Sequence, residues 1–286
     1  MKDGSEIQQW ILSRNGFEDV GALRGFLSGR QRILDAGCGN GRVTALLRSL
    51  CDDDAEVIGV DYSSAEVARA NLAHLERVFV FAADLTQDLS DLGRFDFIYC
   101  QEVLHHTENP FLAFSNLAEL LSHGGEIAIY VYKKKAPGRE FMDEFVRSQI
   151  SVLDYQEAMQ ACREITALGM ALSQLGTTVA VPSVGVMGIE EGSYDIQRFI
   201  YHFFAKCFWN SELTPEENAL VNFDWYHPET ASRHSIDEVL TWFKQCSLEV
   251  VHVHVDHYGI TVRGRRSMGE AGDHSQIAGR AHCQKP

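Results

Sequence analysis

The sequence predicts an α/β protein built around a mostly parallel sheet. Three observations lead to this fold class. Strand-like and helix-like segments alternate over the first half of the chain, a glycine cluster follows the first strand-like segment, and an aspartate follows each of the next two. Such alternation is typical of βαβ units and a parallel sheet. A chain of 286 residues is long enough for one large domain, or for one domain with an additional covering segment.

Short apolar runs predict five strands in this half, at residues 32–36, 56–60, 78–82, 95–100 and 126–132. A helix with apolar residues at helical spacing is expected at 41–50. Ser63 or Ser64 can cap the next helix, which runs to about His74. Pro110 suits the first turn of a third helix to about residue 122, which Gly124 and Gly125 are expected to end.

The regular alternation stops after residue 132. Residues 133–233 are mostly helical in pattern, with 194–209 as the clearest helix. Ser235 and Glu238 have the spacing of a capping box for a helix to about Cys246, and strands are expected at 248–255 and 260–263. We therefore expect an N-terminal helical cover (1–29), a core (30–132), a helical insertion (133–233), a return to the core (234–263) and a mobile tail (264–286).

Composition excludes several classes of protein. The net charge of −15 leaves no overall basic surface for nucleic acid, and it disfavours an anionic membrane. We see no apolar run long enough to span a membrane and no secretory leader. The seven cysteines are scattered without a pairing pattern, and no zinc-binding spacing occurs, so we expect reduced thiols, a cytoplasmic location and no metal site.

The segment 33–41 carries the most specific signal. Glycines at 37, 39 and 41 lie between a predicted strand and a predicted helix, where they allow a tight turn and close approach of a ligand to the backbone. Asp61 ends the second strand about 20 residues later and can accept hydrogen bonds from ribose hydroxyls. The dinucleotide fingerprint requires a further glycine where this chain has Arg42, so a nicotinamide dehydrogenase is disfavoured.

The pattern Asp-x-Gly-x-Gly-x-Gly at 35–41 resembles motif I of class I S-adenosylmethionine-dependent methyltransferases. Residues 57–63 look like motif II, 82–85 like the segment that contacts adenine, and 95–110 like the motif after the fourth strand of small-molecule methyltransferases. The resemblance covers about 30–132 and the last two strands. It implies a Rossmann-like, mostly parallel seven-stranded sheet with a final antiparallel strand and a helical lid insertion, and S-adenosylmethionine as the cofactor.

The resemblance also implies roles for single residues. Asp35 supports the glycine loop, Asp61 takes the ribose hydroxyls and Asp84 takes the adenine amino group. The full set that it places around the cofactor is Asp35, Gly37, Cys38, Gly39, Asn40, Gly41, Asp61, Tyr62, Ser63, Ala83, Asp84, Leu85, Gln101 and Glu102. His105 and His106 follow the fourth strand at the edge where ligands bind, so either is a candidate general base.

The insertion is the predicted wall of the acceptor site. Its candidate acceptor-binding residues, with the end of the fifth strand, are Tyr132, Lys133, Arg139, Arg198, His202, Trp225, Tyr226 and His227. The basic cluster of Lys133, Lys134 and Lys135 with Arg139 could anchor an acidic group of the acceptor, such as a carboxylate or phosphate, although a solvated basic turn is the default. The aromatic residues of 199–209 could instead pack the lid or form an oligomer interface. Trp10 and Arg14 share one side of a short helix, which either packs plainly or covers the cofactor.

Together these observations predict a methyltransferase that acts on an O, N or C atom of a small molecule, with no nucleic-acid or membrane partner. Two alternatives stay open. The same cofactor site could serve transfer of the aminocarboxypropyl group, or the chain could be a catalytically silent cofactor-binding partner subunit. The motifs do not identify the acceptor, and an oligomer formed through the insertion is not excluded.

Overall fold

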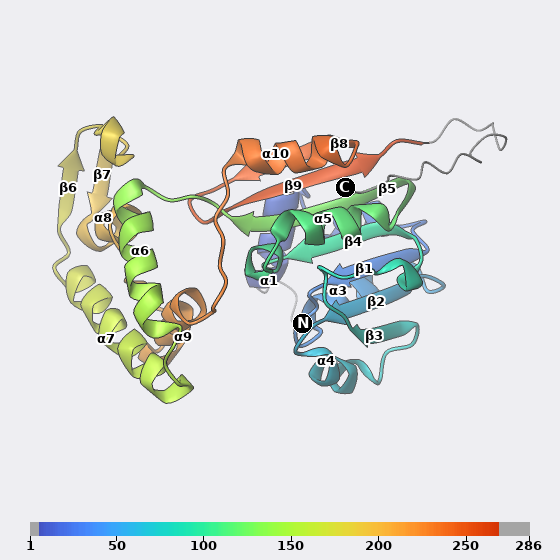
Figure 1. The fold of residues 1–286 in the computed structure, drawn as a ribbon, viewed down its shortest axis with the longest axis horizontal. Helices are drawn as coiled ribbons and strands as arrows, with labels where there is room; N and C mark the ends of the chain where they lie inside the picture. Colours follow the sequence, from blue (N-terminus) through green and yellow to red (C-terminus); the bar gives the residue numbers. More distant parts are fainter. Residues whose placement is uncertain (1–5, 269–286) are drawn as a thin grey trace, which may run out of the picture.

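The computed structural model describes residues 6–268 (Figure 1). Seven strands form one sheet in the order β3-β2-β1-β4-β5-β9-β8. Their bounds are β1 Arg32–Ala36, β2 Glu56–Asp61, β3 Val78–Ala82, β4 Phe95–Gln101, β5 Leu121–Tyr132, β8 Leu248–Val255 and β9 Gly259–Arg266. The first five are parallel, and β9 runs antiparallel to both β5 and β8. The predicted mostly parallel, seven-stranded sheet is therefore confirmed.

Helices cover both faces of the sheet because its central strands are apolar on both sides. On one face lie α5 (Pro110–Glu119) and α10 (Ile236–Gln245), whose Phe114 and Phe243 are fully buried. The other face is covered by α1 (Glu6–Asn15), α2 (Val20–Leu27) and α3 (Arg42–Leu50), and α4 (Ala65–Leu72) packs near β3 (Figure 1). The capping box of Ser235 and Glu238 is present at the start of α10.

Two expectations at the ends of elements are wrong. Helix α5 ends at Glu119, earlier than expected, because Leu121 already belongs to β5 and pairs with Phe95 of β4. The next pair of residues between these two strands is Phe97 with Glu126, so the register shifts in between. Residues 122–125, with both glycines, form an irregularity inside β5 instead of a helix end. The expected tail begins too early, because residues 264–266 continue β9 in register with β8. The expected tail residues 269–286 lie outside the described residues.

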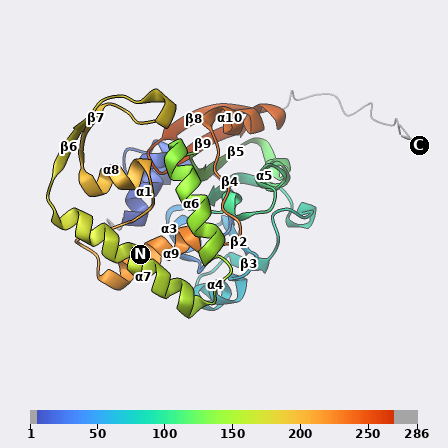
Figure 2. The same ribbon diagram turned by 60° about the vertical axis from the view of Figure 1, so that its left-hand side comes forward.

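The insertion forms a lobe beyond the end of the sheet at which β5 ends (Figures 1 and 2). This lid lobe consists of α6 (Pro137–Ile150), α7 (Tyr155–Gln174), β6 (Thr178–Val181), β7 (Gly192–Asp195), α8 (Ile196–Phe203) and α9 (Pro215–Tyr226). The expected helix 194–209 is confirmed only for its middle part, because α8 covers 196–203. Tyr194 pairs with Val179 in the β6–β7 hairpin, Asp195 caps α8, and the chain leaves the helix after Phe203.

One buried carboxylate joins three parts of the lid lobe. Asp143 of α6 is 1% exposed and pairs with the guanidinium of Arg139 at 2.5 Å. Its oxygens also accept hydrogen bonds from Trp225 Nε1 at 2.9 Å and Tyr226 OH at 2.8 Å, both on α9. The backbone N–H of Lys206, after α8, donates to it at 3.0 Å. A buried charge with this many donors is satisfied, so it fixes α6 and α9 relative to each other.

The two connections to the lid lobe lie side by side. Lys133, just after β5, forms a parallel bridge with His234, just before α10. The His234 N–H donates to the Tyr132 carbonyl at 2.8 Å, and the Lys134 N–H donates to the His234 carbonyl at 2.9 Å. The lobe therefore leaves and rejoins the sheet at one point. Within residues 6–268, no helix has both the length and the apolar character needed to cross a membrane.

Candidate functional site

A first cavity of about 590 Å³ lies at the carboxyl ends of β1 to β4. The glycine loop after β1 forms one wall. Gly37 has φ +81°, and a Cβ added there would lie 2.1 Å from Val103 Cγ2, so no larger residue fits. The N–H groups of Gly37 and Cys38 both donate to the Val60 carbonyl, at 2.7 and 2.9 Å, which ties the loop to β2.

Two aspartates are held in fixed orientations in this cavity. Asp61 Oδ2 accepts the Gly39 N–H at 2.9 Å, and Oδ1 accepts the N–H groups of Ser63 and Ser64 at 3.0 and 2.7 Å. Asp84 Oδ1 accepts the N–H and the hydroxyl of Thr86, which lowers the pKa of Asp84. Both carboxylates keep lone pairs that can accept further hydrogen bonds from a ligand.

The structure brings most of the predicted cofactor residues to this cavity. Those that line it are Gly37, Gly39, Asp61, Tyr62, Ser63, Ala83, Asp84, Leu85 and Glu102. Asp35, Cys38, Asn40, Gly41 and Gln101 do not. Asp35 accepts the Thr44 hydroxyl at 2.6 Å, and burial raises the pKa of Asp35 to about 7. It joins β1 to α3 beneath the loop. Sequence reasoning missed Val103 and Thr107 as lining residues, although both lie within the segment 95–110 that resembles the motif after the fourth strand.

The two candidate histidines have different surroundings. His105 is fully buried, stacks on Tyr132 with ring centroids 3.6 Å apart, and lines neither this cavity nor the next one described. His106 lines the first cavity, and its Nδ1 lies 2.8 Å from the Thr230 carbonyl. A carbonyl only accepts, so Nδ1 carries the proton and Nε2 keeps a free lone pair. Burial lowers the pKa of His106, which keeps the ring neutral at pH 7.

A second cavity of about 510 Å³ lies between β5, α1 and the lid lobe. Glu102 lines both cavities and therefore marks their junction. Its φ of +60° is a strained conformation for a residue other than glycine, which is common at functional sites. Arg14 of α1 donates to Glu102 at 3.0 Å and stacks over Tyr130 at 4.2 Å. Burial raises the pKa of Glu102, and Arg14 opposes this shift.

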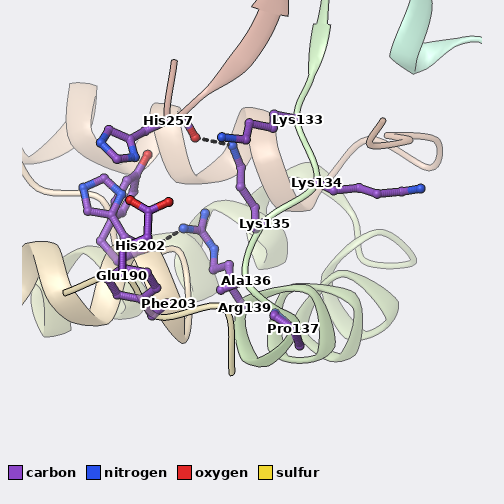
Figure 3. Close-up of a pocket in the computed structure, with 12 residues that line it drawn as sticks. Lys133, Lys134, Lys135, Ala136, Pro137, Arg139, Glu190, His202, Phe203 and His257 are labelled. Atoms are coloured by element: carbon purple, nitrogen blue, oxygen red, sulfur yellow. Dashed lines mark hydrogen bonds between the residues drawn. The ribbon is translucent and has the colours of Figure 1, made fainter. Parts of the chain in front are cut away.

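The predicted acceptor residues are divided among several places. Tyr132, Arg139 and Trp225 line the second cavity. Lys133, Arg139 and His202 line a third cavity of about 220 Å³, between the segment after β5 and α8 (Figure 3). The remaining three line none of these cavities: Tyr226 bonds Asp143, Arg198 bonds the Trp209 carbonyl, and His227 stacks on Phe223.

Sequence reasoning missed Lys206 as a residue of the second cavity. Lys206 lines it together with Tyr201, with Lys135 of the predicted basic cluster, and with Trp10 and Arg14 of α1. The sequence draws attention to the aromatic residues of 199–209 and predicts a helix there that includes Lys206. Helix α8 ends at Phe203, so Lys206 lies after it. Within residues 6–268, no group of three or more His, Cys, Asp or Glu side chains is placed to hold a metal ion.

Comparison with known proteins identifies the core. Residues 34–129 match the family described as "Methyltransferase domain". The segment 34–129 is therefore a methyltransferase domain of the class I, S-adenosylmethionine-dependent type. It is 37% identical over 112 residues to a ubiquinone biosynthesis O-methyltransferase of Alkalilimnicola ehrlichii, covering 38% of this chain and 44% of the relative. It is 34% identical over 151 residues to an uncharacterized protein of a Synechococcus species, covering 48% of this chain and 34% of the relative.

The chain thus spans only a third to under half of the length of these two relatives. Among solved structures, it is similar to an O-methyltransferase family protein from Burkholderia thailandensis, with 14% identity and a TM-score of 0.49. That similarity covers 92% of this chain and 57% of the other. The whole lid lobe and most residues of the second cavity lie outside the matched methyltransferase domain, so the acceptor has to be inferred from this chain's own residues.

Proposed function

We propose that this methyltransferase-family chain transfers the methyl group of S-adenosylmethionine to an O, N or C atom of a small-molecule acceptor. The observation that carries the proposal is the first cavity, where the glycine loop, Asp61 and Asp84 gather at the carboxyl ends of adjacent strands. Oxygen is the first acceptor atom to test, because the relative with 37% identity is named as an O-methyltransferase.

The residues of the first cavity suit the parts of this cofactor. Asp61 can accept both ribose hydroxyls, and Asp84 can accept the adenine amino group. Gly37 and Gly39 leave room for the methionine side against the backbone. When bound, the cofactor would supply a methyl group on a sulfonium: an acceptor atom would bond to the methyl carbon while the carbon–sulfur bond breaks, and S-adenosylhomocysteine would leave. We place that methyl group near Glu102, where the first cavity meets the second.

We further propose that the lid lobe holds the acceptor and excludes water, and that His106 removes a proton from acceptors that must lose one. Support for the base comes from its tautomer, because hydrogen bonding of Nδ1 to Thr230 leaves Nε2 able to accept a proton. Positioning of the acceptor can supply an effective molarity of ~10⁵–10⁸ M, and a base adds ~10²–10⁴-fold.

Mass spectrometry of the purified chain incubated with S-adenosylmethionine and a metabolite extract tests the proposal. S-adenosylhomocysteine together with an acceptor heavier by one methylene group is the expected result. Methylthioadenosine would replace the proposal with aminocarboxypropyl transfer. Tight cofactor binding without consumption would favour the silent partner subunit. Asp61→Ala serves as the control, because it should abolish whichever product is seen.

A further inference from the structure

Two lysine ammonium groups face the second cavity without a carboxylate partner. Lys206 follows α8 and is 8% exposed, and Lys135 lies half-buried in the segment after β5. Within residues 6–268, neither Nζ forms an ion pair. Both lie against the same ring, with Nζ at 4.7 Å (Lys206) and 5.7 Å (Lys135) from the centroid of Trp225.

The arginines around that ring differ from the lysines in one respect. Three guanidinium groups also lie within 6.0 Å of the Trp225 centroid, and each has a carboxylate beside it. These pairs are Arg139–Asp143 at 2.5 Å, Arg147–Glu144 at 3.7 Å and Arg233–Glu140 at 2.6 Å. Arg14, which lines the cavity together with Arg139, pairs with Glu102 and Asp256. The uncompensated positive charge therefore belongs to the two lysines.

Their hydrogen-bond donors are also incompletely used. Lys135 Nζ donates to the carbonyls of His257 and Tyr258 at 2.7 and 2.8 Å, as Figure 3 shows for His257, and keeps one N–H free. Lys206 Nζ forms no hydrogen bond with the described residues and keeps three. An ammonium group buried without a partner is costly, and this one is kept in a chain of net charge −15. A ligand anion would satisfy it.

The rest of the cavity suits a flat apolar body. Tyr132, Tyr201, Phe208 and Trp225 line it, and its volume of about 510 Å³ lies in the ordinary range for small-molecule sites. Glu102 lines the cavity where it meets the first one, and it disfavours a second negative charge beside it, although the charge of Lys206 also acts on Glu102. An acceptor whose anionic group binds the lysines would keep that group off the Glu102 carboxylate.

We propose that the second cavity binds an aromatic acceptor that carries a carboxylate, and that Lys206 and Lys135 hold that carboxylate. This inference rests on the proposed function, since it names the acceptor class of the same site. Burial lowers the pKa of each lysine to about 7, and a bound carboxylate would favour the charged form of both. Lys134 is excluded from this role, because it pairs with Glu238 and points away from Lys135 (Figure 3).

The test compares an acid with its uncharged amide. Binding of 1-hydroxy-2-naphthoate and of 1-hydroxy-2-naphthamide to the full chain is measured by isothermal titration calorimetry, with and without saturating S-adenosylhomocysteine. The wild type should bind the acid about 10- to 100-fold more tightly than the amide. Lys206→Met and Lys135→Met should each remove most of this preference. Lys134→Met, a neighbouring lysine of the same length, should keep it.

Equal binding of acid and amide, or no binding of either, would overturn the inference, as would a preference that survives both cavity variants. The separate lysine variants keep the test decisive if one of them folds poorly. Failure of the proposed function gives a different pattern. S-adenosylhomocysteine would then fail to bind the wild type, whereas the preference for the carboxylate, measured also without the nucleoside, would persist.

Discussion

Lys206 is a buried cation whose removal should stabilise the fold. Its ammonium group is 8% exposed and has no ion pair among residues 6–268, although its backbone N–H is bonded to Asp143. Burial lowers the pKa of Lys206 from 10.5 to about 7. At about 1.36 kcal/mol for each pKa unit, this shift corresponds to about 5 kcal/mol of destabilisation at low pH. Methionine keeps the length of the side chain and removes the charge.

The direction of this stability change, and its dependence on pH, follow from the protonation of Lys206 in the folded and unfolded states. Below pH 7, Lys206 is charged in the folded and unfolded states, so its cost to folding is complete. Between pH 7 and 10.5, the folded state is neutral and the unfolded state is still protonated, so the cost declines as the pH rises. Lys206→Met should therefore raise the free energy of unfolding by about 2–5 kcal/mol at pH 6, and by less than half of that gain at pH 9.

Urea unfolding at pH 6 and pH 9, followed by circular dichroism, measures this effect. Lys134→Met is the control, because Lys134 is exposed and forms a surface pair with Glu238. It should change stability by at most about 1 kcal/mol. A Lys206→Met protein that is less stable than the wild type at pH 6, or that shows the same difference at both pH values, would refute the reasoning.

Three further predictions concern the core and the lobe. Asp61→Ala should weaken binding of S-adenosylhomocysteine by about 10- to 100-fold, measured by calorimetry, because it removes the acceptor for two hydroxyls. Unchanged affinity would contradict that role. Asp143→Ala should lower the free energy of unfolding by about 3–5 kcal/mol in urea, because it leaves the Arg139 guanidinium buried and unpaired; a loss below 1 kcal/mol would contradict this account. The wild-type kcat should be constant above pH 6.5 and fall at more acidic pH, because burial lowers the pKa of His106. His106→Asn should lower kcat about 10²–10⁴-fold and remove that acidic limb, measured as S-adenosylhomocysteine formation from pH 5 to 8; an unaltered pH profile would exclude this base.

The core of the fold could be predicted because its signals are local. Strands β1 and β3 have the predicted bounds, since each is an apolar run ended by polar or glycine residues. The errors arise where hydrogen bonding to a neighbouring strand, and not the local sequence, determines where an element begins or ends. Gly124 and Gly125 have turn chemistry, yet the pairing of Leu121 and Glu126 with β4 keeps them inside a strand. The β6–β7 hairpin joins two strands in which no residue is fully buried, so hydrophobic alternation could not reveal it.

The same distinction applies to the site. Asp61 is the last residue of β2 and Asp84 lies two residues after β3, so their place at one sheet edge could be inferred from strand order. The second cavity joins Arg14, Glu102 and Lys206, which lie far apart in the chain, and no single segment indicates their meeting. One error was avoidable. The spacing of Arg139 and Asp143 places them on one face of a helix, which already indicated that this arginine has an internal partner.

The bridge between Lys133 and His234 has a consequence for evolution and engineering. The chain segments that enter and leave the lid lobe lie next to each other at Lys133 and His234. The sheet therefore needs only this pair of adjacent attachment points to carry an inserted lobe. The buried Asp143 carboxylate at the centre of the lobe is satisfied by residues of the lobe itself. Acceptor specificity can then change through replacement of the whole segment 135–233, while the residues of the first cavity stay unchanged.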